Sequence, residues 1–257
     1  MNYFAKIKYL GTDFHGFGVQ PGLRTVQGEL CTALGQALGV NVLVTGSSRT
    51  DAKVHANEMC IRVTAEGATV PPEKLPIACI PFLPNDISLF WAKECDNDFH
   101  PRYDAKGKEY LYRILNSKVP DPFFADRAWH LPRIISDEGL AVMRKCAAAL
   151  IGRHDFSAFM SAGSDVSDTV RDIKYLDIKR QGDFIEVRIC ADGFLYNMVR
   201  IIVGTLVECA FGRFCAEDIV NMIKSKSRSQ SGMTAPPEGL YLNRVFYEEI
   251  ATFPKNQ

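Results

Sequence analysis

The chain has 257 residues, enough for one large domain or two smaller ones, and it can bury a sizeable core without disulfides or metals. Hydrophobic residues make up 47% and charged residues 23%, with 30 basic and 30 acidic side chains and a formal net charge of zero. This balance is typical of a globular protein and excludes a disordered chain, and any nucleic-acid-binding surface would need local segregation of basic residues.

Nothing in the sequence predicts a membrane segment or a bound group. No apolar run reaches the roughly 20 residues of a membrane span, and the start of the chain, Met1 to Lys6, lacks the apolar core of a signal peptide. The eight cysteines form no C-x-x-C pair and do not cluster with the five histidines. We therefore expect a cytoplasmic protein with reduced core thiols and no metal site.

The first part of the chain predicts strands around a capped helix. Thr25 can cap a helix whose apolar positions run from Val26 to Leu38, with Gly39 as its end. The proline-rich residues 71–84 allow at most a short helix. Alternation of apolar and polar residues predicts strands at 3–10, 40–45, 59–64 and 87–91.

The second part of the chain also predicts strands and capped helices. A hairpin is predicted around Gly182-Asp183, between strands at 172–180 and 184–191. Ser136 can cap a helix that runs to Leu150. Further strands are predicted at 110–114 and 240–247, and further helices at 195–210 and 216–224.

These elements indicate an α+β fold with an antiparallel-rich mixed sheet and helices packed on it. The two halves have similar element content, without a repeat at the level of residues. The stretch from Asp96 to Lys106 is the expected boundary, which gives an N-terminal half of residues 1–104 and a C-terminal half of residues 105–257.

The strongest chemical signal is the segment of residues 46–56, which reads Gly-Ser-Ser-Arg-Thr-Asp-Ala-Lys-Val-His-Ala. Small and polar residues between two strands predict a tight loop, and catalytic groups concentrate on such loops. A structural interpretation is equally open from these residues alone. Threonine and aspartate stabilise turns, and Arg49 could form a surface ion pair with Asp51.

The segment Arg49–Ala56 resembles the R-T-D-A-G-V-H-A catalytic loop of the tRNA pseudouridine synthase A family, with Lys53 at the position of the glycine. Further segments resemble the family in the same order along the chain: residues 25–27, 99–102 with 108–114, 194–200 and 234–242. The resemblance covers the chain nearly end to end. If the family glycine has a positive φ angle, lysine at this position is strained, and if it does not, the lysine could add a contact to phosphate.

The resemblance implies the pseudouridine synthase fold and the isomerisation of uridine to pseudouridine in the anticodon stem-loop of tRNA, at positions 38, 39 and 40. The N-glycosidic bond breaks and C5 of the base rejoins C1′ of the ribose, so the reaction needs no cofactor. Asp51 is the implied catalytic carboxylate, acting as a nucleophile or as a base toward the ribose. The first half would carry this loop, and the second half would complete the active-site cleft.

Three further residues are implied to bind the substrate. Arg200, in the segment resembling the family's F-x-x-x-M-V-R motif, would face the catalytic aspartate, and its alternative is an ordinary helix-surface arginine. Tyr112 would stack on the target uracil and move a proton with its hydroxyl, and its alternative is core packing. Arg49 would occupy the space that the flipped uridine leaves.

A homodimer with a shared basic cleft is the implied way in which a neutral chain binds tRNA. Two alternatives for function remain at this stage. One is a related synthase that acts on another tRNA site or another RNA, and the other is an RNA-binding protein without catalysis.

Overall fold

The computed structural model describes residues 1–163 and 166–248 and divides the chain into two compact units. The first unit comprises Met1–Lys106 and Tyr241–Glu248, and the second comprises Gly107–Leu240. The chain leaves the first unit two residues after the expected division between 104 and 105. Residues Tyr241–Glu248 then return to the first unit, whereas the expected ranges 1–104 and 105–257 place them in the C-terminal half.

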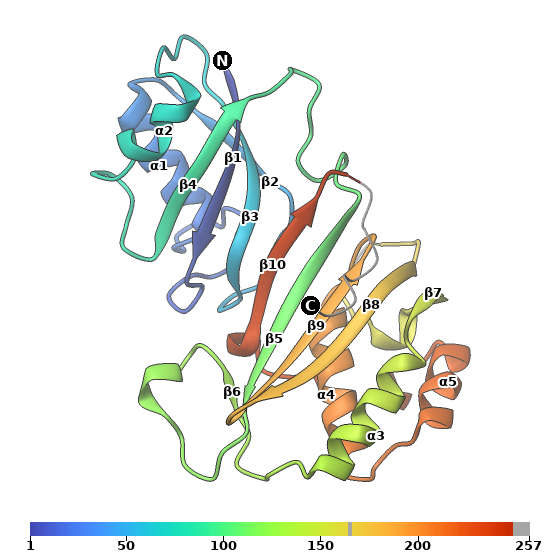
Figure 1. Ribbon diagram of the computed structural model, residues 1–257. Helices are drawn as coiled ribbons and strands as arrows, with labels where there is room; N and C mark the ends of the chain where they lie inside the picture. Colours follow the sequence, from blue (N-terminus) through green and yellow to red (C-terminus); the bar gives the residue numbers. More distant parts are fainter. Residues whose placement is uncertain (164–165, 249–257) are drawn as a thin grey trace. The chain divides into compact units, whose positions relative to one another are not determined.

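The first unit is an antiparallel-rich sheet with two helices on one face (Figure 1). Its elements are β1 (Asn2–Tyr9), α1 (Val26–Leu38), β2 (Leu43–Gly46), β3 (His55–Thr64), α2 (Leu75–Ala78), β4 (Ile87–Glu94) and β10 (Leu240–Phe246), with a 3₁₀ turn at Pro72–Lys74. β1 pairs antiparallel with both β3 and β4, and β2 pairs antiparallel with β3. β10 runs parallel to β3, so the chain's last strand lies beside the strand that follows the Asp51 loop.

The predicted ends of α1 are confirmed. The Thr25 hydroxyl accepts a hydrogen bond from the Gly28 N–H at 3.3 Å, and Gly39 ends the helix in a left-handed conformation with φ of 67°. The helix buries its Val26 and Leu34 side chains. Each of these signals lies within one turn of the helix end that it determines, which explains why the sequence alone predicts them.

The second unit also combines an antiparallel sheet with helices (Figure 1). Its elements are β5 (Gly107–Leu115), β6 (Trp129–His130), α3 (Asp137–Ala148), β7 (Gly152–Asp155), β8 (Val170–Gln181), β9 (Phe184–Ala191), α4 (Met198–Ala210) and α5 (Ala216–Ser225), with 3₁₀ turns at Pro122–Phe124, Ser157–Phe159, Arg228–Gln230 and Pro237–Gly239. β9 pairs antiparallel with β5 and β8, β7 pairs antiparallel with β8, and β6 is parallel to β5. The expected α+β class with antiparallel-rich sheet is confirmed.

The hairpin of the second unit is confirmed, with Gln181 opposite Phe184 and Gly182 at φ of 59°. Five predicted boundaries are wrong by three or four residues. The strand predicted at 110–114 begins at Gly107, and the strand predicted at 87–91 ends at Glu94. The strand predicted at 40–45 is β2 at Leu43–Gly46, the strand predicted at 59–64 begins at His55, and the helix predicted from 195 begins at Met198. β3 starts early because β10 supplies a pairing partner for its first residues, and no local pattern records that partner.

A β-bulge at Phe90 changes which side chains of β4 are buried. The pairing of β4 with β1 shifts register between Leu89 and Trp91, so that Phe90 is an extra residue. Beyond this bulge Ala92 takes the buried position, while Trp91 is exposed. In the part of the chain that the structure describes, no helix is long and apolar enough to span a bilayer.

Candidate functional site

The loop around Asp51 joins β2 to β3 and belongs wholly to the first unit. At its start the buried Ser47 donates its N–H to the Cys60 carbonyl at 2.8 Å. Thr50 is also buried, with its hydroxyl 2.7 Å from the Tyr9 hydroxyl. Asp51 itself is half-buried, and its carbonyl accepts the Val54 N–H at 3.2 Å, which closes a turn. The carboxylate therefore sits on a short turn between two anchored ends.

A second segment, residues 11–17, supports this loop from one side, and we call it the brace. The Phe17 N–H donates to the Thr50 carbonyl at 3.0 Å, and the Phe14 carbonyl accepts the Lys53 N–H at 3.3 Å. These two bonds fix the backbone on both sides of Asp51. Both bonds use backbone N–H and carbonyl groups, which nearly every residue carries, so residue types do not predict the brace.

Two glycines let the brace approach the Asp51 loop closely. A Cβ atom on Gly11 would collide with the Val54 carbonyl. A Cβ atom on Gly16 would lie 2.8 Å from the Thr50 carbonyl oxygen, and Gly16 also has a φ of 99°. Glycine is therefore required at both positions for this backbone contact.

His55, the first residue of β3, is fully buried and fastens the end of the loop. Its Nδ1 accepts the Gly11 N–H at 2.9 Å, so Nδ1 carries no proton. The imidazole stacks on the Tyr241 ring with a centroid separation of 4.6 Å. We did not predict a role for His55 or Tyr241. The only signal was that both residues fall in segments that resemble the family.

Lys53 is exposed and adopts φ of 65°, in the left-handed region that favours glycine. The condition under which a lysine here would be strained is therefore met. The left-handed conformation disfavours a residue with a Cβ atom by roughly 1–2 kcal/mol.

Arg49 lies two residues before Asp51, and its side chain is exposed. Among the residues that the structure describes, the Arg49 guanidinium forms no ion pair. The surface pair with Asp51, which the sequence left open, is not formed.

Tyr112 lies on β5 of the second unit and is fully buried. Its hydroxyl donates to the Pro236 carbonyl at 2.7 Å, and its ring meets Trp129 edge-on with centroids 6.3 Å apart. Gly239 packs so close to the ring that a Cβ there would lie 2.6 Å from it. Burial raises the pKa of the Tyr112 hydroxyl well above its ordinary value, and the nearby Glu238 carboxylate adds to this rise. The hydroxyl thus stays protonated and acts as a donor.

Arg200 lies in the first turn of α4, in the same unit as Tyr112. Its Nε donates to the Ala235 carbonyl at 2.7 Å, and its Nη1 donates to the Asn197 Oδ1 at 2.8 Å. The Ala235 N–H in turn donates to the Arg200 carbonyl at 3.1 Å. Arg200 and Tyr112 therefore donate hydrogen bonds to the carbonyls of two consecutive residues, Ala235 and Pro236. We call residues 234–240, which supply them, the closing segment.

The structure thus brings Tyr112 and Arg200 together in the second unit and sets Asp51 and Arg49 on one loop of the first. In residues 1–163 and 166–248 no group of three or more histidine, cysteine or acidic side chains is arranged to hold a metal ion.

Comparisons with known proteins give one consistent result. The family described as tRNA pseudouridine synthase matches residues 146–248. The chain is 42% identical to tRNA pseudouridine synthase A of a Thermoanaerobacter species, over 96% of this chain and 99% of the relative. It is 41% identical to the protein of the same name from Bacillus pumilus, over 96% of this chain and 100% of the relative. A solved structure, the crystal structure of a Cbf5-Nop10-Gar1 complex, matches with a TM-score of 0.33 and 13% identity over 80% of this chain and 54% of that chain, too weak a likeness to carry an argument.

Proposed function

Since the chain belongs to the tRNA pseudouridine synthase A family, it is an isomerase of uridine in tRNA, and we propose that Asp51 is its catalytic carboxylate. The observation that supports Asp51 most strongly is its setting. The backbone on both sides of it is bonded to the brace, while the side chain is only half-buried. A carboxylate held in this way can be presented to a substrate with little loss of position.

The proposed reaction rearranges one nucleotide without a second reactant. The bond between N1 of the uracil and C1′ breaks, and a bond between C5 and C1′ forms. C5 loses a proton and N1 gains one, so atoms and electrons balance. Asp51 assists as a nucleophile at C1′ or as a base toward the ribose, and both roles use the ionised carboxylate that an aspartate provides at neutral pH.

Arg49 is proposed to act while the target uridine leaves the RNA stack. Extruding a base costs a few kcal/mol. A planar guanidinium two residues from the catalytic carboxylate can fill the vacated space and contact phosphate. The exposure of Arg49 and the absence of an ion pair among the described residues support this role, because the side chain gives up no protein partner to contact RNA.

Tyr112 and Arg200 are proposed to bind the substrate from the second unit. Tyr112 would present its ring to the uracil. Because the ring is fully buried, this requires a shift of residues that cover it, such as those around Gly239. The bonds of Tyr112 and Arg200 to the closing segment would hold both side chains in register for this contact.

The proposed targets are uridines 38, 39 and 40 of the tRNA anticodon stem-loop, in the cytoplasm. We also propose a homodimer, because a chain with zero net charge needs a concentrated basic surface to hold a large polyanion. Light scattering at micromolar concentration is expected to give twice the chain mass of 28.7 kDa. A monomer that modifies tRNA at the full rate would contradict a shared cleft.

The experiment that tests the function is to incubate the protein with unmodified tRNA and to map pseudouridine by position. Wild-type protein is expected to modify positions 38–40, whereas Asp51→Asn, which keeps the shape but lacks the charge, should give no detectable product. Asp98→Asn is the matched control, because Asp98 is an exposed carboxylate of the same unit, and it should act as wild type. Turnover by Asp51→Asn would remove Asp51 from catalysis, and product at other positions alone would change the proposed target.

A further inference from the structure

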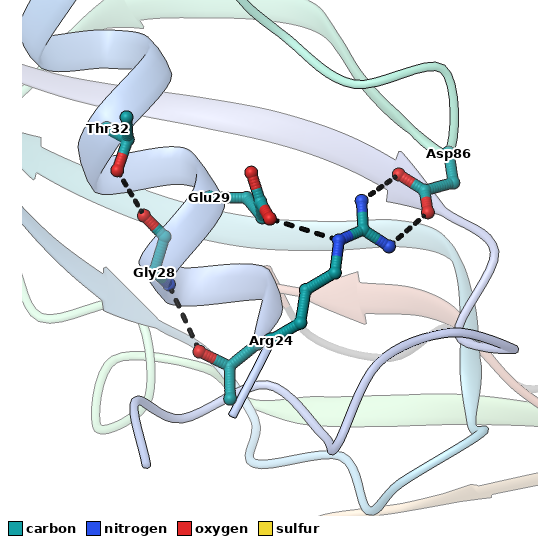
Figure 2. Close-up of polar contacts among 6 residues, drawn as sticks. Arg24, Gly28, Glu29, Thr32 and Asp86 are labelled. Atoms are coloured by element: carbon teal, nitrogen blue, oxygen red, sulfur yellow. Dashed lines mark hydrogen bonds and ion pairs between the residues drawn. The ribbon is translucent and has the colours of Figure 1, made fainter. Parts of the chain in front are cut away.

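Arg24 lies just before α1, in the first unit, and it is held by two acidic side chains. Its two terminal nitrogens donate to both carboxylate oxygens of Asp86, at 2.7 and 3.0 Å, and its Nε donates to Glu29 at 3.0 Å (Figure 2). A planar guanidinium that donates to both oxygens of one carboxylate has a defined orientation, unlike a lysine ammonium. The guanidinium plane is therefore fixed relative to its neighbours.

The guanidinium so oriented packs on the brace. Its Cζ lies 4.1 Å from the centroid of the Phe14 ring, and Phe14 is 2% exposed. The Arg24 carbonyl also accepts the His15 N–H at 2.9 Å. Arg24 thus contacts the middle of the brace with both its side chain and its backbone.

Phe14 passes this restraint to the Asp51 loop along two routes. Its carbonyl accepts the Lys53 N–H at 3.3 Å, two residues after Asp51. Its ring meets the Tyr9 ring edge-on with centroids 6.5 Å apart, and the Tyr9 hydroxyl bonds to the Thr50 hydroxyl just before Asp51. Both flanks of Asp51 are therefore connected to the residue on which Arg24 packs.

We propose that Arg24 is a positioning residue for the Asp51 loop, acting through Phe14 under the orientation imposed by Asp86 and Glu29. It does not touch the reacting atoms. This inference rests on the proposed catalytic role of Asp51. The restraint of the loop by Arg24 also has a physical consequence that does not depend on the role of Asp51. It should protect the Lys53 amide against hydrogen exchange.

The test compares Arg24→Lys, which keeps the charge but lacks the planar fork, with wild type and with Arg213→Lys. Arg213 is the matched control, since it also pairs with a carboxylate, that of Glu208 at 2.6 Å, and packs on a phenylalanine, Phe214, but lies in the second unit. Three quantities are measured: the single-turnover rate on tRNA, the dissociation constant for tRNA, and amide hydrogen exchange.

For Arg24→Lys we expect the single-turnover rate to fall roughly 10- to 100-fold with little change in tRNA affinity, because loss of alignment costs rate rather than binding. Exchange of the Lys53 amide should accelerate about tenfold or more, while exchange of the Ser47 amide, which bonds to Cys60 outside the brace, should not change. Asp86→Asn should act in the same direction, and Arg213→Lys should match wild type in all three quantities.

Wild-type rate and wild-type Lys53 exchange in Arg24→Lys would overturn the inference. Equal acceleration at Ser47 and Lys53 would also overturn it, because that would indicate general destabilisation of the unit. Failure of the proposed function gives a different result, namely no product from wild type or normal product from Asp51→Asn. In that case the rate of hydrogen exchange at the Lys53 amide alone decides whether Arg24 positions the Asp51 loop.

Discussion

The Asp51 loop and the Tyr112–Arg200 cluster hold their candidate residues by different means. In the Asp51 loop, backbone bonds and two close-packed glycines fix the chain, and the candidate side chains Asp51 and Arg49 are left half-buried or exposed. In the Tyr112–Arg200 cluster, the candidate side chains themselves make the structural bonds, to the carbonyls of the closing segment.

Substitutions in these two regions must therefore be interpreted differently. A change of the Asp51 or Arg49 side chain leaves the backbone bonds between the loop and the brace, because those bonds use no side-chain atom. A change of Tyr112 or Arg200 removes a bond that holds the closing segment. Loss of activity in the second region must therefore be separated from loss of stability.

The largest effect on stability is expected at Tyr112. Tyr112→Leu leaves a cavity at a fully buried site and an unpaired Pro236 carbonyl, so the free energy of unfolding should fall by about 2–4 kcal/mol. Tyr112→Phe removes only the hydrogen bond and should lower it by about 1–2 kcal/mol. Urea unfolding measures both values, with the largely exposed Tyr103→Leu as a control expected to stay within about 0.5 kcal/mol of wild type.

Single-turnover assays on folded Tyr112→Phe then separate the two proposed uses of this residue. The sequence led us to expect a proton-transfer role for the hydroxyl, in which case the phenylalanine variant is crippled while tRNA binding persists. A wild-type rate in Tyr112→Phe would leave the ring as the only contribution, and a wild-type rate in Tyr112→Leu would remove Tyr112 from the site.

Gly11 tests whether backbone packing is what holds the Asp51 loop. Gly11→Ala places a methyl group against the Val54 carbonyl, and the resulting displacement should destabilise the protein by about 1–3 kcal/mol and slow turnover. Gly18→Ala is the matched control, because the nearest atom to its new Cβ is a Gln27 oxygen at 3.9 Å, an ordinary contact. Thermal unfolding and single-turnover rates measure the effect, and equal behaviour of the two variants would show that the contact is unimportant.

Arg200 and Arg49 test the contrast between the two regions most directly. Arg200→Lys loses at least one of the bonds to Ala235 and Asn197 and should lower the free energy of unfolding by about 1–2 kcal/mol. Arg49→Lys should leave it within about 0.5 kcal/mol of wild type while reducing the modification rate. If Arg49→Lys destabilises as much as Arg200→Lys, the proposed division between the regions fails.

The smallest effect is expected at Lys53. Lys53→Gly relieves the left-handed strain but loosens the unfolded chain, so stability should change by less than about 1 kcal/mol. If the Lys53 ammonium contacts a phosphate, Lys53→Gly should reduce the steepness with which tRNA affinity falls with salt concentration, on logarithmic scales, by about one. Lys53→Ala separates the two effects, because alanine removes the charge and keeps the strain. An alanine variant that is more stable than the glycine variant would argue against backbone strain.

The elements that depend on near neighbours in the chain were predictable from the sequence. The caps of α1 at Thr25 and Gly39 and the hairpin at Gly182 use bonds or dihedral angles within a few residues of each other, so their residue types record them. Asp51 was predicted to be the catalytic carboxylate through its resemblance to a family motif, and that role stays a prediction. From its residue type and neighbours alone, a structural turn was an equally good interpretation.

The way in which that turn is held depends on contacts between segments that lie far apart in the chain. The brace bonds to the Asp51 loop over a separation of more than thirty residues, and β10 places Tyr241 beside His55 from near the far end of the chain. The bonds that hold Tyr112 and Arg200 end on backbone carbonyls of the closing segment. Every residue carries a carbonyl and nearly every residue an N–H. Contacts between these groups therefore cannot be recognised from residue types, and they form only when folding brings the segments together.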